Sequence, residues 1–439
     1  MQRIAVVGSG ISGLAAAWQL TRQAPQAQVT LFEAGAHFGG HANTVDLTLD
    51  GITHGVDTGF LVYNERTYPN LVRLFAELGV DVAASDMSFS VQTPHANGRP
   101  GLEWSGSSLD TVFAQRRNLL RPSFLRMLAD ILRFNRLTTA LAESQAEAAL
   151  TLPLGDFLDA HGFSDTFRQH YLLPMIGCIW SCPTDQMLRF PVATLIRFCH
   201  NHGLIQVTNR PQWYTVRGGS RQYVAKLLPA LTDARLNSPV FDIRRHADGV
   251  DLSSTQGTER FDALVLACHA DQSLALLGTE ATPDEAAVLG AIRYHPNTAV
   301  LHTDARVLPS RSKAWAAWNY ERATTDQGER TRVCLHYLIN RLQPLPWDTP
   351  VIVSLNPLRD IDEAHVHQRI EYAHPVFDLA AIAAQRRVPE LQGRQRTWFC
   401  GAWCGYGFHE DGLKAGMAAA DGVAQALPHL ARASMRVVA

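Results

Sequence analysis

Gly8-Ser9-Gly10-Ile11-Ser12-Gly13 is the stretch that decides the fold. It has the spacing G-x-G-x-x-G, follows the apolar run Arg3–Val7 and opens a helical pattern over Ile11–Arg22. A second apolar run, Val29–Phe32, ends at Glu33, which lies twenty positions beyond the last glycine. A strand, a glycine turn, a helix and a second strand with a terminal acidic residue predict a βαβ unit that binds the diphosphate of a dinucleotide.

Each glycine of this turn has its own physical role. Gly8 permits the tight turn, Gly10 lets the backbone approach a diphosphate, and Gly13 lets the helix pack closely on the strand. The helix N-terminus supplies N–H donors and the positive end of the helix dipole. Glu33 can accept a hydrogen bond from a ribose hydroxyl, and its charge would repel a 2′-phosphate. The alternative is a glycine turn that holds no ligand.

Composition narrows the class of protein. With 439 residues, 46% of them hydrophobic and 18% charged, the chain is long and apolar enough for two or three folded domains. A net charge of −2 argues against nucleic acid as a partner. The seven cysteines are odd in number and scattered, which is typical of reduced thiols. Without a recognisable leader or a long apolar run, we expect a cytoplasmic protein.

The rest of the chain predicts interleaved helices and strands. Thr44–Leu49 alternates polar and apolar residues, Asp50-Gly51 is a hairpin turn signal, and Ile52–Asp57 pairs back. A helical block is expected over about residues 107–205. The other expected strands are Val240–Arg245, Ala263–Ala267, Thr298–His302, Ala314–Tyr320, Arg332–Leu338, Val351–Leu355 and Thr397–Cys400, and the other expected helices are Pro69–Leu78, stopped by Gly79, and Gly412–Leu427, capped by Asp411.

Several further motifs occur in the order found in flavoproteins of the amine oxidase-like group, which includes carotenoid desaturases and protoporphyrinogen oxidase. They are Glu33-Ala34 with Gly39-Gly40-His41, where the group has arginine in place of His41; Asp57-Thr58-Gly59-Phe60; Arg217-Gly218-Gly219-Ser220; Asn237-Ser238-Pro239-Val240; the strand end at Ala267; Phe399-Cys400-Gly401-Ala402; and Glu410-Asp411-Gly412-Leu413-Lys414-Ala415-Gly416. The sequence thus resembles this group, and the resemblance implies FAD as the cofactor.

The resemblance implies which residues contact FAD. They would be Gly8, Ser9, Gly10, Ile11, Ser12, Gly13, Glu33, Ala34, Gly39, Gly40, His41, Thr58, Gly59, Phe60, Val240, Ala267, Gly401, Ala402, Gly412 and Leu413. It also implies that the last helix points its N-terminus at the pyrimidine edge of the flavin, where that helix end would stabilise the reduced anion.

Two departures argue against amine oxidation. Many amine oxidases of the group carry a lysine that holds a water at flavin N5, whereas the matching strand here has Asn297 or Thr298. The only lysines in the chain are Lys226, Lys313 and Lys414. Those enzymes also often place an aromatic residue just before the C-terminal motif, where this chain has His409.

Three longer stretches resemble a bacterial family of FAD-binding oxidoreductases that are encoded beside cyclopropane-fatty-acid-synthase-like methyltransferases. They are Thr58–Asn70, Ala317–Tyr320 and Gly405–Gly412. This resemblance implies an acyl lipid as the substrate and a lipid methyltransferase as a candidate partner.

Candidate catalytic residues follow from these motifs. His409 could orient the substrate or move a proton, or it could be part of a helix entry that bonds the backbone. Tyr63 follows the second flavin turn and is a candidate pocket wall. Tyr320 ends a strand and could reach the flavin, or it could be packed within the sheet. Neither C-x-x-x-C pair, Cys178/Cys182 or Cys400/Cys404, has zinc-site spacing, so we expect no metal.

A run of arginines lies in the helical block. Between Arg116 and Arg136 six arginines, which are Arg116, Arg117, Arg121, Arg126, Arg133 and Arg136, alternate with apolar residues, and only Asp130 interrupts the positive charge. A basic amphipathic helix can lie on an anionic membrane leaflet, which would place the protein at the inner membrane face. The alternative is a solvated helix face.

Together these observations predict an α/β protein with an FAD-binding Rossmann-like domain of the glutathione reductase type and a second, substrate domain of mixed sheet plus helices. The first should comprise residues 1–75, 210–285 and 365–439, and the second residues 76–209 and 286–364. The expected function is desaturation or isomerisation of an apolar, fatty acyl substrate by hydride transfer to flavin N5. The alternatives are a flavin amine oxidase and a flavin-binding partner of a lipid methyltransferase that does not turn over.

Overall fold

A five-stranded parallel sheet forms one end of the molecule. In this computed structural model, which describes residues 1–93, 101–146, 150, 152–181, 183–206, 210–323 and 333–437, the sheet has the order β10-β2-β1-β14-β20. All four strand pairings are parallel. The strands come from three distant parts of the chain: β1 (Arg3–Val7), β2 (Gln28–Phe32), β10 (Asp233–Arg235), β14 (Ala263–Leu266) and β20 (Thr397–Phe399).

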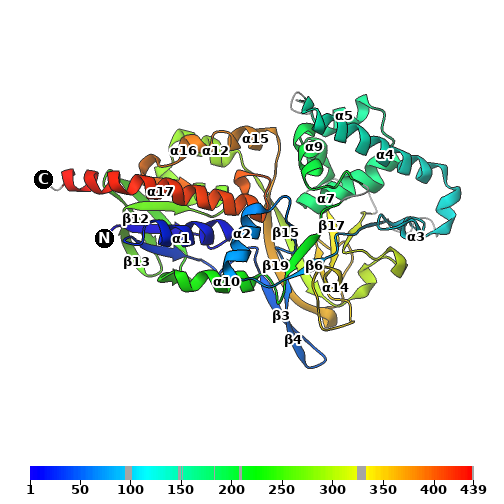
Figure 1. Cartoon of the computed structure of the whole chain (residues 1–439), viewed down its shortest axis with the longest axis horizontal. Helices are drawn as coiled ribbons and strands as arrows, with labels where there is room; N and C mark the ends of the chain where they lie inside the picture. The colour runs from blue at the N-terminus through cyan, green and yellow to red at the C-terminus, as the bar shows by residue number, and fades with distance from the viewer. Residues whose placement is uncertain are drawn as a thin grey trace.

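The two ends of the chain meet on this sheet. Helix α1 (Ile11–Gln23) and the long helix α17 (His409–Val437) lie side by side (Figure 1). A Cβ atom on Gly416 would lie 2.1 Å from the carbonyl oxygen of Ser12, and one on Gly412 would lie 2.8 Å from Ile11. Because α17 has glycine at both positions, its backbone can rest directly on the start of α1.

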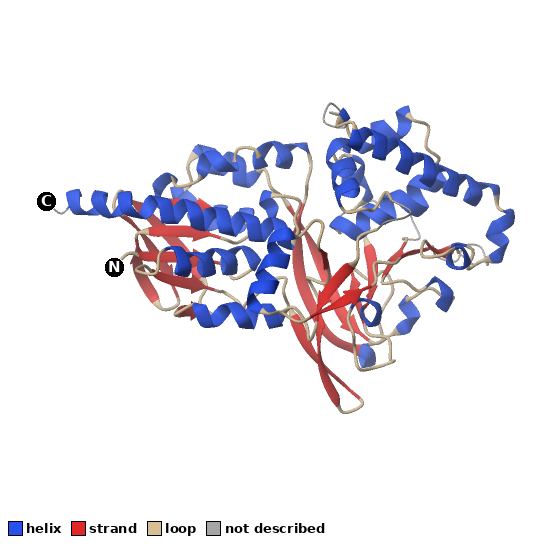
Figure 2. Cartoon of the chain, viewed as in Figure 1, coloured by secondary structure: helices blue, strands red, loops and turns tan. Residues whose placement is uncertain are grey.

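The opposite face and edge of this unit carry shorter elements. An antiparallel sheet follows the order β11-β12-β13, with α11 packed on β11 and α12 packed on α11, α15 and α16, whereas α10 contacts α1 and α2 (Figure 2). The elements are β11 (Val240–His246), β12 (Gly249–Ser254), β13 (Gly257–Phe261), α10 (Arg221–Leu227), α11 (Ala270–Leu277), α12 (Pro283–Gly290), α15 (Leu379–Gln385) and α16 (Val388–Leu391).

A seven-stranded mixed sheet forms the second half of the structure, in the order β19-β15-β18-β17-β16-β7-β8. Only the β16–β7 pairing is parallel. The strands are β7 (Phe89–Gln92), β8 (Glu103–Ser105), β15 (Tyr294–His302), β16 (Trp318–Glu321), β17 (Cys334–Leu338), β18 (Ile352–Leu355) and β19 (Val366–Pro375). Strand β19 belongs to this sheet although it lies in the third segment expected for the FAD domain, and the predicted domain boundaries stay predictions.

The helical block covers part of this sheet. It contains α3 (Leu109–Val112), α4 (Pro122–Glu143), α5 (Leu154–Ala160), α6 (Asp165–Phe167), α7 (Leu173–Trp180), α8 (Thr184–Leu188) and α9 (Val192–Asn201). Helix α7 contacts β16, whereas α4 packs on α6 and α9. None of the helices in the described ranges is both long and apolar enough to cross a membrane.

Smaller elements connect the two halves. They are the hairpin β3 (Thr44–Leu49) and β4 (Ile52–Asp57), the sheet of β5 (Tyr63–Asn64), β9 (Trp213–Val216) and β6 (Val82–Ser85), and the helices α2 (Pro69–Leu78) and α14 (Ile339–Leu342). The expected fold class is confirmed, as are the βαβ unit, the hairpin at Asp50-Gly51 and the helix that Gly79 stops with a φ of 60°.

Two expected elements were wrong in detail. The strand predicted from Ala314 begins only at Trp318, because Ser312–Ala314 forms a 3₁₀ turn. The last helix begins at His409 rather than after a cap at Asp411. The Asp411 carboxylate instead accepts hydrogen bonds from two backbone N–H groups just before the helix. The strand expected from Arg332 begins outside the described residues and is seen from Cys334.

The contact between α1 and α17 generates a stability prediction. Replacing Gly416 with Ala should lower the free energy of unfolding by about 1–3 kcal/mol, because the new methyl group overpacks the contact with Ser12. The loss should appear although alanine is about 1 kcal/mol more favourable than glycine inside a helix. Urea unfolding of the FAD-loaded protein measures it.

Gly290→Ala in α12 is the matched control, because a Cβ atom there would meet only Leu274, at an ordinary 3.6 Å. That variant should be as stable as the natural protein or slightly more stable. Equal stability of the Gly416→Ala variant and the natural protein would contradict the proposed tight contact.

Candidate active site

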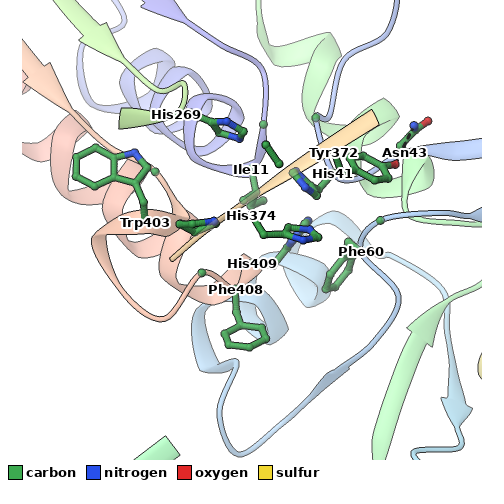
Figure 3. A pocket seen from close by; sticks show the side chains of 18 of the residues that line it. Ile11, His41, Asn43, Phe60, His269, Tyr372, His374, Trp403, Phe408 and His409 are labelled. Carbon is green, nitrogen blue, oxygen red and sulfur yellow. Dashed lines mark hydrogen bonds between the residues drawn. The ribbon is translucent and has the colours of Figure 1, made fainter. Parts of the chain in front are cut away.

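One cavity of about 1070 Å³ runs from the start of α1 to the seven-stranded sheet and helices α7 and α9. This volume is at the upper end of the range for small-molecule sites. Figure 3 shows its central part, where side chains from both halves of the structure converge. The cavity therefore has two ends of different chemistry, one at the glycine turn and one among apolar side chains.

The glycine-turn end has the form of a diphosphate cradle. Gly8 has a φ of 100°, and a Cβ atom on Gly13 would lie 1.8 Å from the Gly8 carbonyl oxygen. A Cβ atom on Gly10, by contrast, would meet no atom within 4 Å, so the backbone there faces open space. The first N–H groups of α1 are available beside it, which suits a bound diphosphate.

Glu33 is fixed at the end of β2. Its carboxylate accepts hydrogen bonds from the Ser9 backbone N–H at 3.0 Å, the Ser9 hydroxyl at 2.5 Å and the Gly35 N–H at 2.7 Å. These bonds hold the acidic group beside the glycine turn, where a ribose hydroxyl of a dinucleotide would lie. The turn and the acidic residue fit the adenosine half of FAD.

His41 lies where the two halves of the structure meet. Its ring stacks on Tyr372 of β19 with centroids 4.8 Å apart, and it lies 5.3 Å from the ring of His374 and 6.4 Å from that of His269 (Figure 3). The buried Nε2 atom of His41 has no hydrogen-bond partner among the described residues. Burial, together with the neighbouring histidines, lowers the pKa of His41 well below its usual value, so the ring is neutral near pH 7.

Asp57 joins two of the flavin-type motifs. Its carboxylate accepts hydrogen bonds from the backbone N–H and the hydroxyl of Ser220, and from the Thr44 hydroxyl. Burial raises the pKa of Asp57 to about 6. The turn around Gly59 is thereby anchored to the double-glycine turn that precedes α10.

His409 begins α17 and faces the middle of the cavity. Its ring stacks on Phe60 with centroids 3.7 Å apart, and its Nε2 atom lies 3.0 Å from the hydroxyl of Tyr223. Burial lowers the pKa of His409 to about 3. The next residue, Glu410, accepts hydrogen bonds from the N–H groups of Asn70 and Leu71 and so anchors the start of α2. A neutral His409 can position a ligand but is a poor proton acceptor at pH 7.

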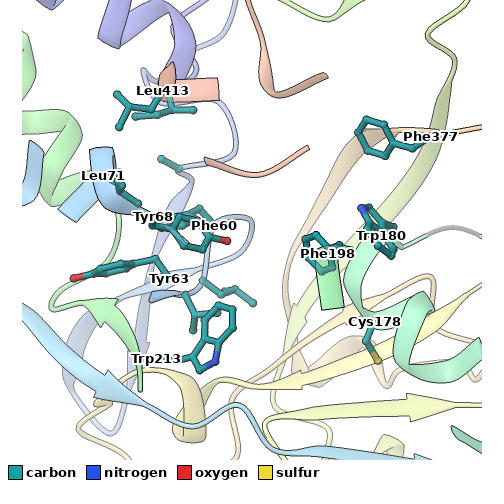
Figure 4. Packing of buried hydrophobic residues seen from close by; sticks show 14 of the residues in the cluster. Phe60, Tyr63, Tyr68, Leu71, Cys178, Trp180, Phe198, Trp213, Phe377 and Leu413 are labelled. Carbon is teal, nitrogen blue, oxygen red and sulfur yellow. The ribbon is translucent and has the colours of Figure 1, made fainter. Parts of the chain in front are cut away.

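The other end of the cavity is walled by apolar side chains. In Figure 4, Phe60 and Trp213 lie on one side, and Trp180 and Phe198 on the other. Strands of the seven-stranded sheet add further apolar residues, which are Phe89, Trp318, Val353, Leu355 and Ile370. This wall suits an apolar ligand, because burying hydrocarbon surface here costs no polar interactions.

The lining carries almost no charge. Among the described residues that line the cavity there is neither lysine nor arginine, and the carboxylates are those of Glu33 and Glu371. Burial lowers the pKa values of His202 and His374 to about 4, so these rings are also neutral near pH 7. The backbone at α1 therefore supplies the positive potential for a diphosphate, and the apolar end offers no counter-ion.

The structure brings most of the predicted cofactor residues to the cavity. Those that line it are Gly8, Ser9, Gly10, Ile11, Ser12, Glu33, Ala34, Gly39, Gly40, His41, Thr58, Gly59, Phe60, Val240, Ala267, Gly401 and Ala402, together with the predicted catalytic residue His409. Their individual roles stay predictions.

Other predicted residues lie outside the lining: Gly13, Gly412, Leu413, Tyr63 and Tyr320. Gly13 faces the backbone of Gly8, and Gly412 faces Ile11 and Ser12 at the start of α1. Tyr320 is fully buried on the cavity side of the sheet, where it packs against Gly177 of α7, and Tyr63 packs on Phe75. Neither tyrosine is part of the cavity lining, and both are buried.

Two features of the structure were not predicted from sequence motifs. Tyr372 and His374 on β19 contribute to the centre of the cavity, although their strand carries no motif. The Tyr372 hydroxyl accepts a hydrogen bond from the Asn43 side-chain amide and shares another with the Thr58 hydroxyl. Alternation along β19 was the signal that could have placed both residues on one face of the sheet.

The second feature is a buried group of potential metal ligands. Within the described residues, it consists of Glu321, Cys334 and His336, on the face of the sheet away from the cavity.

The buried His409 generates a pH prediction. Because its pKa is near 3 in the folded protein and near 6.5 in the unfolded chain, its stabilising contribution is full above pH 6.5 and is lost as the pH falls. Between pH 7.5 and 5.5 the natural protein should lose about 1.4 kcal/mol more unfolding free energy than the His409→Gln variant. Urea unfolding at both pH values measures the difference, and His161→Gln, which removes an exposed histidine, is the control. Identical pH dependence of the natural protein and the His409→Gln variant would refute it.

Comparisons with known proteins agree with this site. The family model described as flavin containing amine oxidoreductase matches residues 11–339. A relative from Mycobacterium tuberculosis named "Putative flavin-containing monoamine oxidase AofH" is 28% identical over an alignment of 277 residues that covers 60% of this chain and 56% of that protein. The chain thus spans little more than half the length of that curated relative.

Solved structures share the fold. A putative protoporphyrinogen oxidase from Exiguobacterium sp. 255-15 has a TM-score of 0.69 at 18% identity, covering 97% of this chain and 99% of that one. Cyclohexylamine oxidase from Brevibacterium oxydans has a TM-score of 0.67 at 18% identity and the same coverage. A CLA-producing fatty acid isomerase from P. acnes has a TM-score of 0.63 at 17% identity, covering 95% of this chain and 97% of that one. With a family match over three quarters of its residues and a cavity suited to FAD, the chain belongs to the flavin-containing amine oxidoreductase family.

Proposed function

We propose that the protein is an FAD-dependent oxidoreductase that desaturates or isomerises an apolar substrate, and that this substrate is a fatty acyl chain. The observation that carries the proposal is the apolar, uncharged end of the cavity. Its wall includes Trp180, Phe198 and Trp213, and no lysine or arginine is present among the described lining residues. An alkyl chain gains free energy from such a wall, whereas a charged group would lose its hydration without a counter-ion.

Residues at one end of the cavity would bind the cofactor, and residues at the other end would bind the substrate. FAD, when bound, supplies an acceptor for a hydride from a substrate C–H bond. The turn at Gly10 and the carboxylate of Glu33 would hold the adenosine diphosphate part. The apolar wall would align the chain and exclude water, and neutral His409 would fix a ligand beside Phe60 without taking up a proton.

The absence of a lining cation also bears on the form of the substrate. A free fatty acid carries a carboxylate, and a buried carboxylate needs a positive partner or several hydrogen-bond donors. The apolar end provides no such partner among the described residues. We therefore favour an esterified acyl chain, whose head group stays outside the cavity. The fatty acid isomerase from P. acnes, which has the same fold, supports acyl chains as ligands of this architecture.

Amine oxidation is the second candidate, because the family and the M. tuberculosis relative are named for it. The strand position where many amine oxidases have lysine would hold Asn297 or Thr298, and the side-chain amide of Asn297 lies 3.0 Å from Nδ1 of His374. Within the described part of the chain, no carboxylate other than Glu33 and Glu371 lines the cavity to receive an ammonium group. A third candidate is a flavin-binding partner of a lipid methyltransferase that does not turn over.

One anaerobic experiment separates the three candidates. The purified FAD-loaded protein is mixed with phospholipid carrying unsaturated or methyl-branched acyl chains, with free fatty acids, or with primary amines and polyamines. We expect flavin bleaching, or a double-bond shift detected by mass spectrometry, with the acyl lipids only. Bleaching by amines alone would overturn the proposal in favour of amine oxidation, and stable yellow colour with every compound together with unchanged double bonds in the lipids would favour the non-catalytic partner.

A variant that fills the apolar end provides a second test. Ile179→Trp should lower kcat/KM for the acyl substrate by about tenfold or more, because a displaced chain loses its alignment with the flavin. Flavin content should not change, since Ile179 lies on α7, in the other half of the structure from the glycine turn that precedes α1 (Figure 1). Ile52→Trp, at the exposed tip of the β3–β4 hairpin, is the size-matched control. If kcat/KM of the Ile179→Trp variant equals that of the natural protein, the acyl substrate does not bind at this end of the cavity.

A further inference from the structure

Helix α4 and the turn before it form an exposed surface of unusual composition. Nine large hydrophobic side chains are exposed among the described residues, and five of them lie within residues 109–132: Leu109, Leu119, Leu120, Leu125 and Leu132. Leu120 is 89% exposed and Leu109 is 79% exposed. The arginines Arg116, Arg117, Arg121, Arg126, Arg133 and Arg136 are exposed in the same segment. We call these eleven residues the α4 surface.

The leucines and arginines of α4 share one side of the helix. Leu125 and Leu132 are seven residues apart and Arg136 is four further on, so the three lie along one stripe. Arg126 and Arg133 form the neighbouring stripe. The buried residues of the helix, including Phe124, Met127 and Phe134, lie on the side that faces the rest of the helical block. The exposed side is therefore apolar and basic at once, and it is not part of the core.

The charge of this segment is opposite to that of the rest of the chain. Residues 109–136 contain six arginines and two aspartates, a net charge of +4, so the remaining residues carry −6 when the whole chain carries −2. Asp110 pairs with Arg116 and Lys313, and Asp130 turns inward to Ser164 and pairs with Arg133. Arg126 and Arg136 form no ion pair with any described residue.

We propose that the α4 surface docks the protein on an anionic lipid bilayer. Leucines that enter the interface and arginines that reach anionic head groups are the two contributions by which an amphipathic helix binds such a membrane. Arginine serves both, because its stem can lie along hydrocarbon while its guanidinium stays with the phosphates. In Figure 1 the α3–α4 segment lies at the edge of the molecule farthest from both chain ends, where a flat bilayer can approach it.

Charge complementarity selects the bilayer over a second copy of this chain. Two copies that met through this surface would bring like charges together, which opposes association. An anionic leaflet instead attracts every arginine of the surface at once. The proposal does not depend on the proposed function, because vesicle binding is measured without turnover.

The test uses the FAD-loaded full-length protein and vesicles of phosphatidylcholine with or without 30% phosphatidylglycerol. We expect the natural protein to co-sediment with the anionic vesicles, more weakly at 0.5 M than at 0.05 M NaCl because salt screens the attraction. An Arg126→Gln, Arg136→Gln variant and a Leu120→Gln, Leu132→Gln variant should each bind about tenfold or more weakly.

The matched control carries Arg386→Gln and Leu379→Gln, which remove one exposed arginine and one exposed leucine outside the α4 surface. It should bind like the natural protein, and circular dichroism and flavin absorbance show that each variant is folded and loaded. Absent binding to anionic vesicles, or equal binding by the natural protein and both α4 variants, would overturn the proposal. So would a natural dimer in analytical ultracentrifugation that the α4 variants convert to monomer, because the surface would then join two copies of the chain.

Discussion

The close approach of backbones around the start of α1 is the constraint on which the rest of the structure depends. Gly13 lets α1 lie against the turn at Gly8, and Gly416 lets α17 lie against Ser12. A side chain at either position would overlap with the neighbouring backbone and force the helix away from it. Because α17 is held there, the segment that leads into it carries His409 and the residues before it to the cavity. Two distant parts of the chain thus form one cofactor site.

Sequence predicts the local parts of this arrangement well. The βαβ unit, the hairpin turn at Asp50-Gly51 and the stop at Gly79 depend on residues that are neighbours in the chain, and the structure has each of them. The parts that depend on contacts between residues far apart in the chain were harder to predict. Strands β7 and β8 are short: β7 pairs with β16 far along the chain and β8 pairs with β7, so their few residues carry little pattern.

The candidate site shows the same division. Motif residues at the glycine turn could be assigned to the cofactor from their spacing, whereas Tyr372 and His374 enter the site only because β19 pairs with β15. Tyr320 was a candidate for the cavity because it lies at a strand end, but its side chain is fully buried against neighbouring elements. A sequence pattern does not show how deeply a side chain is buried. The neutral state of His202, His374 and His409 follows from burial, which is likewise a property of the folded chain.

The central claim is that the open space beside Gly10 holds the diphosphate of FAD. It is tested most directly by titrating the apoprotein with FAD and comparing it with a Gly10→Val variant. Gly10 has an extended backbone that any residue adopts, and its Cβ position meets no protein atom, so the variant should fold normally. The account predicts one tightly bound FAD per natural chain and at least about a hundredfold weaker binding by the variant, because the new side chain fills the space for the phosphates. A folded natural protein that does not bind FAD, or a variant that binds it equally well, would contradict the account.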